Sequence, residues 1–450
     1  MTKKYDLCIV GGGIAGLSIG EIFARSGLKV VILEKNEKLC MGDSGAHHEW
    51  FHFGSLYSIF PNNQALRTLV GGIDDLLVYY RDFEGMNLHV TNNGRLISVE
   101  KESKWYREDF IEYVVSARND PDFSLKNFTN FKDFFHRLFF LLTWETAIKQ
   151  FISRHSRFYK YDWRRGTASF YIPRAGIFDY SRSVIEKFRD ENVLLDPDTH
   201  FGIRGYDRPM NAYNIISDLT RSYLSYGGEI QVSTEYKSYR KRDAAVEIKS
   251  NLGTIETDKL ILAMGKDIKG SLQGGTKVSV FVSPLLVVYP HVCDRNFVRL
   301  TPFMTKTINH LKHSIEGKVY SLIGGGYFAD PSHPEDVDIA GKNLMDRANT
   351  VFPRMKSAEI VKVYFGNKTE IVQKIKDFKK RNYLYRMEKV DDDVYFVIPG
   401  KFSLGFSLAV NTFKEIMGHY PSTTVSYNKD MDVSSYVGYM KHKNIILNGG

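Results

Sequence analysis

The stretch YDLCIVGGGIAGLSIGEIFARSGLKVVILE, residues 5–34, decides the fold. A short apolar run, residues 7–10, leads into a G-x-G-x-x-G motif that begins at Gly11. A helical pattern of apolar residues follows, and a second apolar run, residues 30–33, ends at Glu34. Apolar runs of this length bounded by glycines are typical of buried parallel strands. The stretch therefore predicts a βαβ unit with a glycine-rich turn.

Each residue of the motif has a physical role in binding a dinucleotide. Gly11 permits the tight turn out of the strand, and Gly13 lets a pyrophosphate approach the backbone without meeting a Cβ atom. Gly16 lets the helix pack closely on the strand. The free N–H groups at the start of the helix, near Ile14 and Ala15, then hold the phosphate charge.

An acidic residue closes the second strand. The Glu34 carboxylate can accept hydrogen bonds from a ribose diol, and we assign Lys35 to the same site. These residues alone do not separate FAD from NAD, because both cofactors share the ADP half. The alternative interpretation is an ordinary βαβ unit whose turn is rich in glycine.

Composition limits the function classes. The chain has 450 residues, a formal net charge of +9 and ordinary globular contents of hydrophobic and charged residues. The charge would suit an anionic substrate, a nucleic acid or an acidic membrane surface, but the basic residues are spread along the chain. Three cysteines give neither a disulfide framework nor a metal spacing. With no signal peptide and no membrane-spanning apolar run, we expect a cytoplasmic protein.

The rest of the chain alternates between strand and helix patterns. We expect helices from 63, at 210–228, 360–379 and 408–417, a hairpin at 88–99, and strands at 168–177, 229–246, 254–263, 278–289, 319–323 and 394–398. Residues 101–165 are rich in aromatic and charged residues and are expected to form a largely helical insertion or cap. Its apolar patch, residues 134–144, is interpreted as a buried or partner-facing helix, with membrane-surface contact as the alternative.

The chain resembles the D-amino-acid oxidase-like flavoproteins, which include glycine and sarcosine oxidases, glycerol-3-phosphate dehydrogenase and 2-hydroxyglutarate oxidase. Five stretches carry the resemblance: GGGIAGLS with Glu34, the loop 44–57 with the Pro61 turn, the helix and strand at 213–232, ILAMG at 261–265, and PGKFSLGFSLA at 399–409. Residues 100–165 and 345–395 match no family pattern. The last stretch also lacks the Gly-Asp or Gly-Trp pattern that many members carry before their C-terminal helix.

The resemblance implies FAD as cofactor and a two-part α/β architecture. We expect a Rossmann-type FAD-binding domain, discontinuous in sequence, and an α+β substrate domain built on an antiparallel or mixed sheet. The cofactor domain is assigned to 1–85, 201–275, 321–345 and 394–450, and the substrate domain to 86–200, 276–320 and 346–393. The family also suggests further cofactor contacts, from Ser44, Ala263, Gly265, Gly325, Gly400, Lys401 and Phe402.

The loop that follows the first unit supplies the main catalytic candidate. His52 lies in HHEWFHFGSLY and could act as a base toward a substrate N–H or O–H, or stabilise reduced flavin. The alternatives are a loop histidine bonded to backbone and, as in some family members, covalent attachment of FAD to a histidine in this region. His47 and His48 are weaker candidates, and a metal site shared by these three histidines and Glu49 is not expected.

Two further catalytic candidates line the expected substrate side. Tyr57 is assigned to the substrate face, with core packing as the alternative. Arg174 is a candidate clamp for a carboxylate, because the planar guanidinium offers two parallel donors. Other arginines compete for that role, namely Arg164, Arg165, Arg204 and Arg208, and Tyr327 is a further candidate for the pocket.

The resulting functional expectation is an FAD-dependent oxidase or dehydrogenase. It would oxidise a C–N or C–O bond of a small amine, amino acid or 2-hydroxy acid by hydride transfer to flavin N5, with the electron acceptor and oligomeric state left open. One alternative keeps the flavin but modifies an amino group linked to a nucleic acid or nucleotide, using the basic and aromatic stretch 151–165. A second alternative is a flavin-binding scaffold or sensor without turnover.

Overall fold

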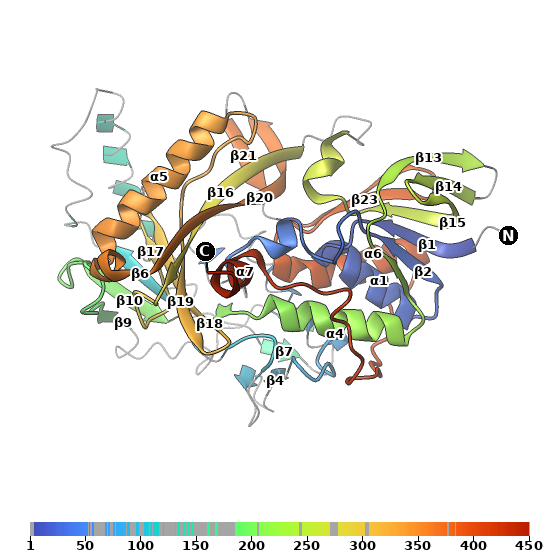
Figure 1. Ribbon diagram of the computed structural model, residues 1–450, viewed down its shortest axis with the longest axis horizontal. Helices are drawn as coiled ribbons and strands as arrows, with labels where there is room; N and C mark the ends of the chain where they lie inside the picture. The colour runs from blue at the N-terminus through green and yellow to red at the C-terminus, as the bar shows by residue number, and fades with distance from the viewer. Residues whose placement is uncertain are drawn as a thin grey trace.

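The computed structural model contains two large sheets, with helices packed against each (Figure 1). It describes residues 4–52, 185–204, 207–242, 245–270, 278–301, 306–375, 378–382 and 384–449, together with short pieces between residues 54 and 169. The expected α/β architecture is confirmed, since one sheet is mainly parallel and contains the N-terminal βαβ unit, while the other is largely antiparallel.

The first sheet has eight strands. Its path runs β12 (Glu229–Gln231), β2 (Val30–Leu33), β1 (Lys4–Val10), β15 (Gly253–Leu262), β14 (Ala245–Ser250) and β13 (Tyr236–Arg242), with β23 (Val394–Ile398) beside β15 and β22 (Arg386–Asp391) beside β23. The strands β12, β2, β1, β15 and β23 are mutually parallel, as buried apolar runs such as VVIL in β2 predict.

Three helices cover this sheet: α1 (Ile14–Arg25), α4 (Ala212–Ser225) and α6 (Gly405–Met417). Helix α1 is buried along its whole length, between the sheet and the other two helices (Figure 1). Its two charged residues are paired: Nε of Arg25 lies 2.9 Å from Oε1 of Glu21, one turn earlier. Ser222 of α4 donates to the same Glu21 oxygen at 2.8 Å. This pairing allows a charged helix to lie inside the core.

The second sheet has nine strands. Their order is β21 (Phe378–Asn382), β20 (Ile360–Ile375), β16 (Val278–Tyr289), β19 (Lys318–Gly325), β18 (Ile308–Ile315), β17 (Phe297–Leu300), β6 (Glu112–Ser116), β10 (His200–Arg204) and β9 (Ile185–Lys187). Helix α5 (Pro334–Val351) packs on one face, where Leu344, Ala348 and Val351 join the core.

Smaller elements complete the described part of the chain. They are the strand pairs β3 (Trp50–Phe51) with β11 (Arg208–Pro209), β4 (Leu88–Val90) with β5 (Leu96–Ser98), and β7 (Lys160–Asp162) with β8 (Thr167–Ser169), the helix α7 (Lys441–Leu447), and the 3-10 turns η1 (Asp43–Gly45), η6 (Gly265–Gly270), η8 (Pro353–Ser357) and η9 (Phe402–Leu404). The pairing of β4 with β5 confirms the expected hairpin.

One expectation about local structure is wrong. Residues 360–379, expected to be helical, form the long strand β20 and the start of β21. The strand pairs with β16 from Val278↔Ile371 to Tyr289↔Ile360, and its inward residues Tyr364, Gly366 and Glu370 follow the period of two that a strand requires. The stretch 101–165, expected to be largely helical, also supplies β6 to the nine-stranded sheet, and most of it lies outside the described residues.

The assignment of segments to domains stays a prediction. Strand β19 and helix α5, which span most of 321–345, lie with the nine-stranded sheet, although the prediction assigns that segment to the cofactor domain. Most of the stretch 151–165, on which the nucleic-acid alternative depended, lies outside the described residues.

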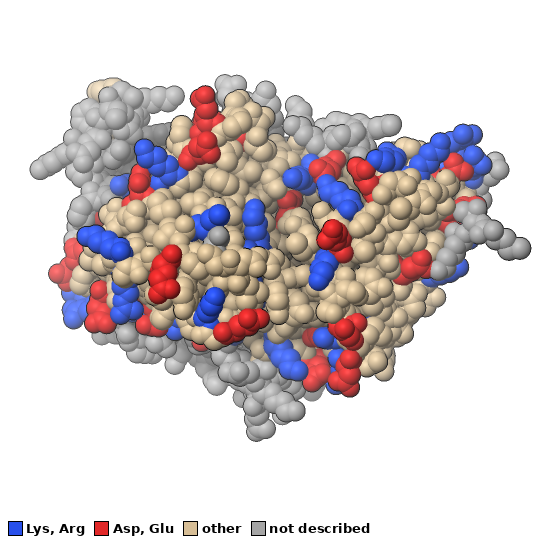
Figure 2. All heavy atoms as spheres, viewed as in Figure 1, with Lys and Arg blue, Asp and Glu red and all other residues tan. Residues whose placement is uncertain are grey.

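The surface shows charges of both signs. On the face drawn in Figure 2, Lys and Arg side chains are interspersed with Asp and Glu and separated by uncharged residues. None of the described helices is long and apolar enough to cross a membrane.

Candidate functional site

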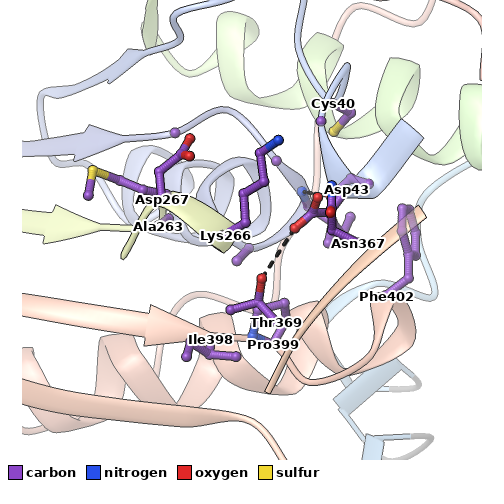
Figure 3. Close-up of a pocket in the computed structure, with 18 of the residues that line it drawn as sticks. Cys40, Asp43, Ala263, Lys266, Asp267, Asn367, Thr369, Ile398, Pro399 and Phe402 are labelled. Atoms are coloured by element: carbon purple, nitrogen blue, oxygen red, sulfur yellow. Dashed lines mark hydrogen bonds between the residues drawn. The ribbon is translucent and has the colours of Figure 1, made fainter. Parts of the chain in front are cut away.

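A cavity of about 620 Å³ lies where the two sheets approach each other. Its walls come from the turn after β1, the end of β2, the loop 40–52, the start of η6, the middle of β20 and the segment 397–402 (Figure 3). The parallel strands β1, β2, β15 and β23 all end at this cavity, which is where ligands bind in open α/β sheets.

The glycine turn at one end of the cavity presents backbone atoms without side chains. Gly11 has φ +104°, and a Cβ atom there would lie 2.5 Å from the carbonyl oxygen of Ala263. A Cβ atom at Gly13 would meet only the Ser44 hydroxyl, at 3.2 Å, within the described part of the chain. Gly16 lies behind the turn, where a Cβ atom would be 1.9 Å from the Gly11 carbonyl oxygen. The glycines therefore let the helix pack closely on the strand and leave the N-terminus of α1 accessible to a ligand.

Glu34 is held in place at the same end. Its side chain is 6% exposed and accepts hydrogen bonds from the backbone N–H of Gly12 (2.7 Å) and from the backbone and side-chain nitrogens of Asn36 (2.9 and 2.6 Å). A carboxylate has about four acceptor sites, so it retains capacity for a ligand hydroxyl. Lys35 pairs with Asp267 of η6, and both residues line the cavity.

The loop after β2 closes over the helix N-terminus. The Ser44 hydroxyl accepts a hydrogen bond from the N–H of Ile14 at 3.0 Å. Its neighbour Asp43 accepts one from Thr369 of β20 at 3.3 Å, the contact drawn in Figure 3. Burial raises the pKa of the Asp43 carboxyl above its ordinary value. The nine-stranded sheet thus reaches into the cofactor end of the cavity.

The other end of the cavity is rich in histidine and lysine. His47, His48 and His52 line it together with Lys368 of β20 and Lys401. Burial, followed by the charge of Lys368, lowers the pKa of His48 well below its ordinary value. Burial, opposed in part by the Glu49 carboxylate, lowers the pKa of His47 to about 4. At neutral pH these imidazoles are uncharged, while the lysines supply positive potential for an anion.

His52 is the most constrained of the three histidines. Its ring stacks on Trp50 with centroids 4.7 Å apart and meets the edge of Tyr57 at 5.8 Å. Its Nδ1 atom lies 3.4 Å from Oδ2 of the buried Asp207. Burial lowers the pKa of His52, although Asp207 opposes the shift.

Glu49 fastens the same loop to helix α7. Its carboxylate is fully buried, lies 3.4 Å from Nζ of Lys443 and 3.2 Å from Nε2 of His442, and accepts the N–H of Ala212 at 2.7 Å. Burial acts to raise the pKa of Glu49, but Lys443, His442 and His313 together hold it well below its ordinary value. Glu49 has φ +52°, so the loop turns sharply where this cluster holds it.

The structure brings most of the predicted site residues together. Twelve of the predicted cofactor residues line the cavity: Gly11, Gly13, Ile14, Ala15, Glu34, Lys35, Ser44, Ala263, Gly265, Gly400, Lys401 and Phe402. Gly16 supports the turn from behind, and Gly325 ends β19 without lining the cavity. The N–H of Lys401 donates to the Pro399 carbonyl at 2.7 Å rather than pointing into the cavity.

The catalytic candidates are placed differently. His52 lines the cavity, whereas Tyr57 lies behind it, its ring 5.6 Å from Nζ of Lys401. Arg174 lies outside the described residues, as do Arg164 and Arg165. Arg208 belongs to β11, and neither it nor Tyr327 lines the cavity. Among the described residues, no group of His, Cys, Asp and Glu side chains is arranged to hold a metal ion.

Several lining residues have no signal in the sequence. Asn367, Lys368, Thr369 and Glu370 come from the middle of a strand whose pairing partner is far away in the chain. Asp207 is likewise brought to Trp50 across 157 positions. Such residues belong to no local motif, so only the pairing of strands could have placed them.

The arrangement fits FAD. The bare glycine turn and the N-terminus of α1 suit a pyrophosphate, and Glu34 suits a ribose. The wider end, bounded by the loop 42–52 and the segment 398–402, leaves room for a ring system beside His52 and Lys401.

Comparison with known proteins agrees with this geometry. The family model described as FAD dependent oxidoreductase matches residues 6–396. A glycine oxidase from Bacillus licheniformis is 32% identical over 83 residues, which are 17% of this chain and 22% of that enzyme. The chain therefore matches about a fifth of the length of this curated relative.

Solved structures share the fold over nearly the whole chain. The L-alpha-glycerophosphate oxidase of Mycoplasma pneumoniae with FAD bound has a TM-score of 0.61 at 14% identity, over 96% of this chain and 98% of that one. L-proline dehydrogenase from P. horikoshii has a TM-score of 0.57 at 12% identity, over 93% and 95%. Glycine oxidase from Geobacillus kaustophilus has a TM-score of 0.53 at 14% identity, over 97% and 98%. At these identities the likeness shows the fold alone.

Proposed function

Because the chain belongs to the family of FAD dependent oxidoreductases, its cofactor is FAD, and we propose that it oxidises a C–N or C–O bond of a small anionic substrate. The substrate class is an amino acid or a 2-hydroxy acid. One observation carries this proposal: the constrained, neutral His52 lies at the same end of the cavity as Lys368 and Lys401. The names of proteins with similar folds, a proline dehydrogenase, a glycine oxidase and a glycerophosphate oxidase, denote substrates that carry a carboxylate or a phosphate, which supports a substrate with an anionic group.

The chain's residues have separate roles in this proposal. FAD supplies the acceptor for the two electrons that leave the substrate carbon. His52 takes the proton from the substrate N–H or O–H, because a neutral buried imidazole is a competent base near pH 7. Lys401 and Lys368 attract the anionic group, and Trp50 with Met210 shields that end of the cavity from water.

The test is a visible absorption spectrum of the purified protein, followed by anaerobic titration with amino acids, 2-hydroxy acids, and amines that lack an acidic group. We expect the compounds with a carboxylate to bleach the flavin band and amines of similar size without one to do so at least tenfold less well. Bleaching that is equal for compounds with and without a carboxylate would contradict the proposed substrate class. A protein that binds FAD but bleaches with none of them would instead favour the scaffold or sensor alternative.

Substitution of the lysines tests whether their charge, and not only their packing, contributes to substrate binding. We expect Lys401→Met and Lys368→Met each to raise KM for an acidic substrate roughly tenfold, since each removes a nearby positive charge. Lys414→Met, on the exposed face of α6, is the control and should leave KM unchanged.

A further inference from the structure

We propose that Asp207 is the positioning residue for His52: it fixes the imidazole with Nδ1 protonated, so that Nε2 is the proton acceptor on the cavity side. The inference rests on the proposed function and extends it to a residue that does not line the cavity.

The small sheet of β3 and β11 brings Asp207 to the histidine. Trp50 pairs with Pro209 and Phe51 with Arg208, so the residue before β11 lies beside the residue that follows β3. Asp207 precedes β11 directly, and His52 follows β3 directly. The two side chains therefore meet because of backbone pairing between distant segments.

The carboxylate of Asp207 is held from several sides. It is completely buried, and its Oδ2 atom accepts hydrogen bonds from the indole N–H of Trp50 at 2.9 Å and from the hydroxyl of Tyr113 at 2.6 Å. The same oxygen lies 3.4 Å from Nδ1 of His52. Trp50 thus holds the carboxylate with its N–H while its ring stacks on the imidazole. Both partners of the Asp207–His52 pair are oriented by one tryptophan.

The chemistry of the pair selects the tautomer. An ionised carboxylate only accepts hydrogen bonds, so the facing Nδ1 must carry the proton and a neutral His52 is unprotonated at Nε2. Nδ1 is buried and forms no hydrogen bond within the described part of the chain, and the Asp207 carboxylate faces it at 3.4 Å. This separation is longer than a formed hydrogen bond, and catalytic hydrogen bonds often shorten only when a substrate binds.

The groups around His52 act in opposite directions. Lys401 and Lys368 disfavour a positive charge on the ring, whereas the neighbouring His48, 6.5 Å away between ring centroids, is uncharged at neutral pH. Asp207 faces them from the far side and favours that charge. A base that must become positively charged during turnover is therefore stabilised in that state by Asp207.

The test is Asp207→Asn in the FAD-loaded protein. The amide would present an N–H to Nδ1 and so favour the opposite tautomer, with Nε2 protonated and unable to accept. We expect kcat for the best bleaching substrate to fall roughly a hundredfold, with FAD binding unchanged and the acid limb of the pH profile moved to lower pH. Unchanged kcat and an unchanged pH profile would overturn the proposal.

A matched control is available in α4. Asp218 is also buried and accepts an indole N–H, from Trp105 at 2.7 Å, but does not line the cavity. Asp218→Asn should keep kcat within about twofold of the unmodified protein. A fall in kcat equal to that of Asp207→Asn would overturn the proposal, because any buried Asp→Asn change would then act alike.

A second measurement does not depend on turnover. In protein labelled with ¹⁵N-histidine, the signals absent from His52→Gln identify His52, and we expect them to show the tautomer protonated at Nδ1. Signals of the Nε2-protonated tautomer would overturn the proposal for Asp207. If the tautomer is as expected and no substrate bleaches the flavin, the proposed function fails while the positioning role stands.

Discussion

At the scale of single residues, burial and the neighbouring lysines act on His52 in the same direction. Both lower its pKa below the ordinary value of about 6.5, and Asp207 opposes them only in part. Because the proposed base must be unprotonated to act, we expect kcat/KM to be flat at neutral pH and to fall only below pH 6.5. A pH profile whose acid limb lies above pH 7 would contradict this assignment.

Replacing the base itself gives the matching prediction. His52→Gln keeps a polar side chain but removes proton transfer, which contributes about 10²–10⁴ in rate. We expect kcat/KM to fall within that range while the visible spectrum still shows bound FAD. Loss of the flavin instead of loss of rate would show that His52 binds the cofactor and would contradict its role as the base. If FAD is attached covalently to His52, the unmodified protein will keep its yellow colour after denaturation, and the denatured His52→Gln variant will not.

Gly16 tests the packing of the first helix. A Cβ atom there would lie 1.9 Å from the Gly11 carbonyl oxygen, which is backbone and cannot move aside cheaply. We expect Gly16→Ala to lower the melting temperature by several degrees and to weaken FAD binding, because α1 must shift away from the turn. Gly71→Ala is the control, since an added Cβ atom there meets none of the described residues within 4 Å. Equal melting temperatures for the two variants would contradict the packing role.

At the scale of elements, the buried pair of Glu49 and Lys443 joins the loop 42–52 to helix α7. Removing one partner leaves the other charge buried without its counterion, which typically costs about 3–5 kcal/mol. We therefore expect Lys443→Met and Glu49→Gln each to lower the free energy of unfolding by that order. The double variant should lose less than the sum of the two.

Denaturant unfolding of the four proteins in this cycle measures the coupling. Lys441→Met is the control within the same helix, because its side chain is exposed and lies 5.5 Å from the ring centre of Tyr364, in a cation–π contact. Strict additivity of the two buried substitutions would show that α7 is held by its apolar residues and not by the ion pair.

The elements also show which parts of the fold a sequence can predict. The βαβ unit at residues 5–34 was predictable because its glycines, apolar runs and acidic residue are neighbours in the chain. Strand β20 was not, because its identity depends on pairing with β16, some 80 positions earlier. The charged residues in β20 favour a helix locally, and the segment is a strand only because it pairs with β16. His52 could be proposed from its loop, whereas Asp207 required the fold.

At the scale of the whole molecule, buried neutral histidines link stability to pH. Burial lowers the pKa of His47 and of His310 to about 4 each, below the value of about 6.5 expected in the unfolded chain. The unfolded state therefore binds more protons below pH 6.5, so stability is greatest above that pH and falls as the pH drops toward 4. Each such histidine contributes on the order of 3 kcal/mol over that range.

We expect the melting temperature to fall steeply between pH 6.5 and pH 4. His310→Gln should make the fall shallower, because the residue no longer titrates, even if the variant is less stable throughout. His419→Gln, at an exposed position, should leave the slope unchanged. A melting temperature that is constant over this interval would show that these histidines are protonated in the folded protein.

The contact between Glu49 and Lys443 has an evolutionary consequence. The two residues stand 394 positions apart, yet neither charge can be lost alone without a large penalty. Lineages descended from this protein should therefore change both residues together or neither. In a hybrid protein that carries the C-terminal segment of a distant homologue, the substitution should be tolerated only when the lysine of that segment and the matching glutamate are both present.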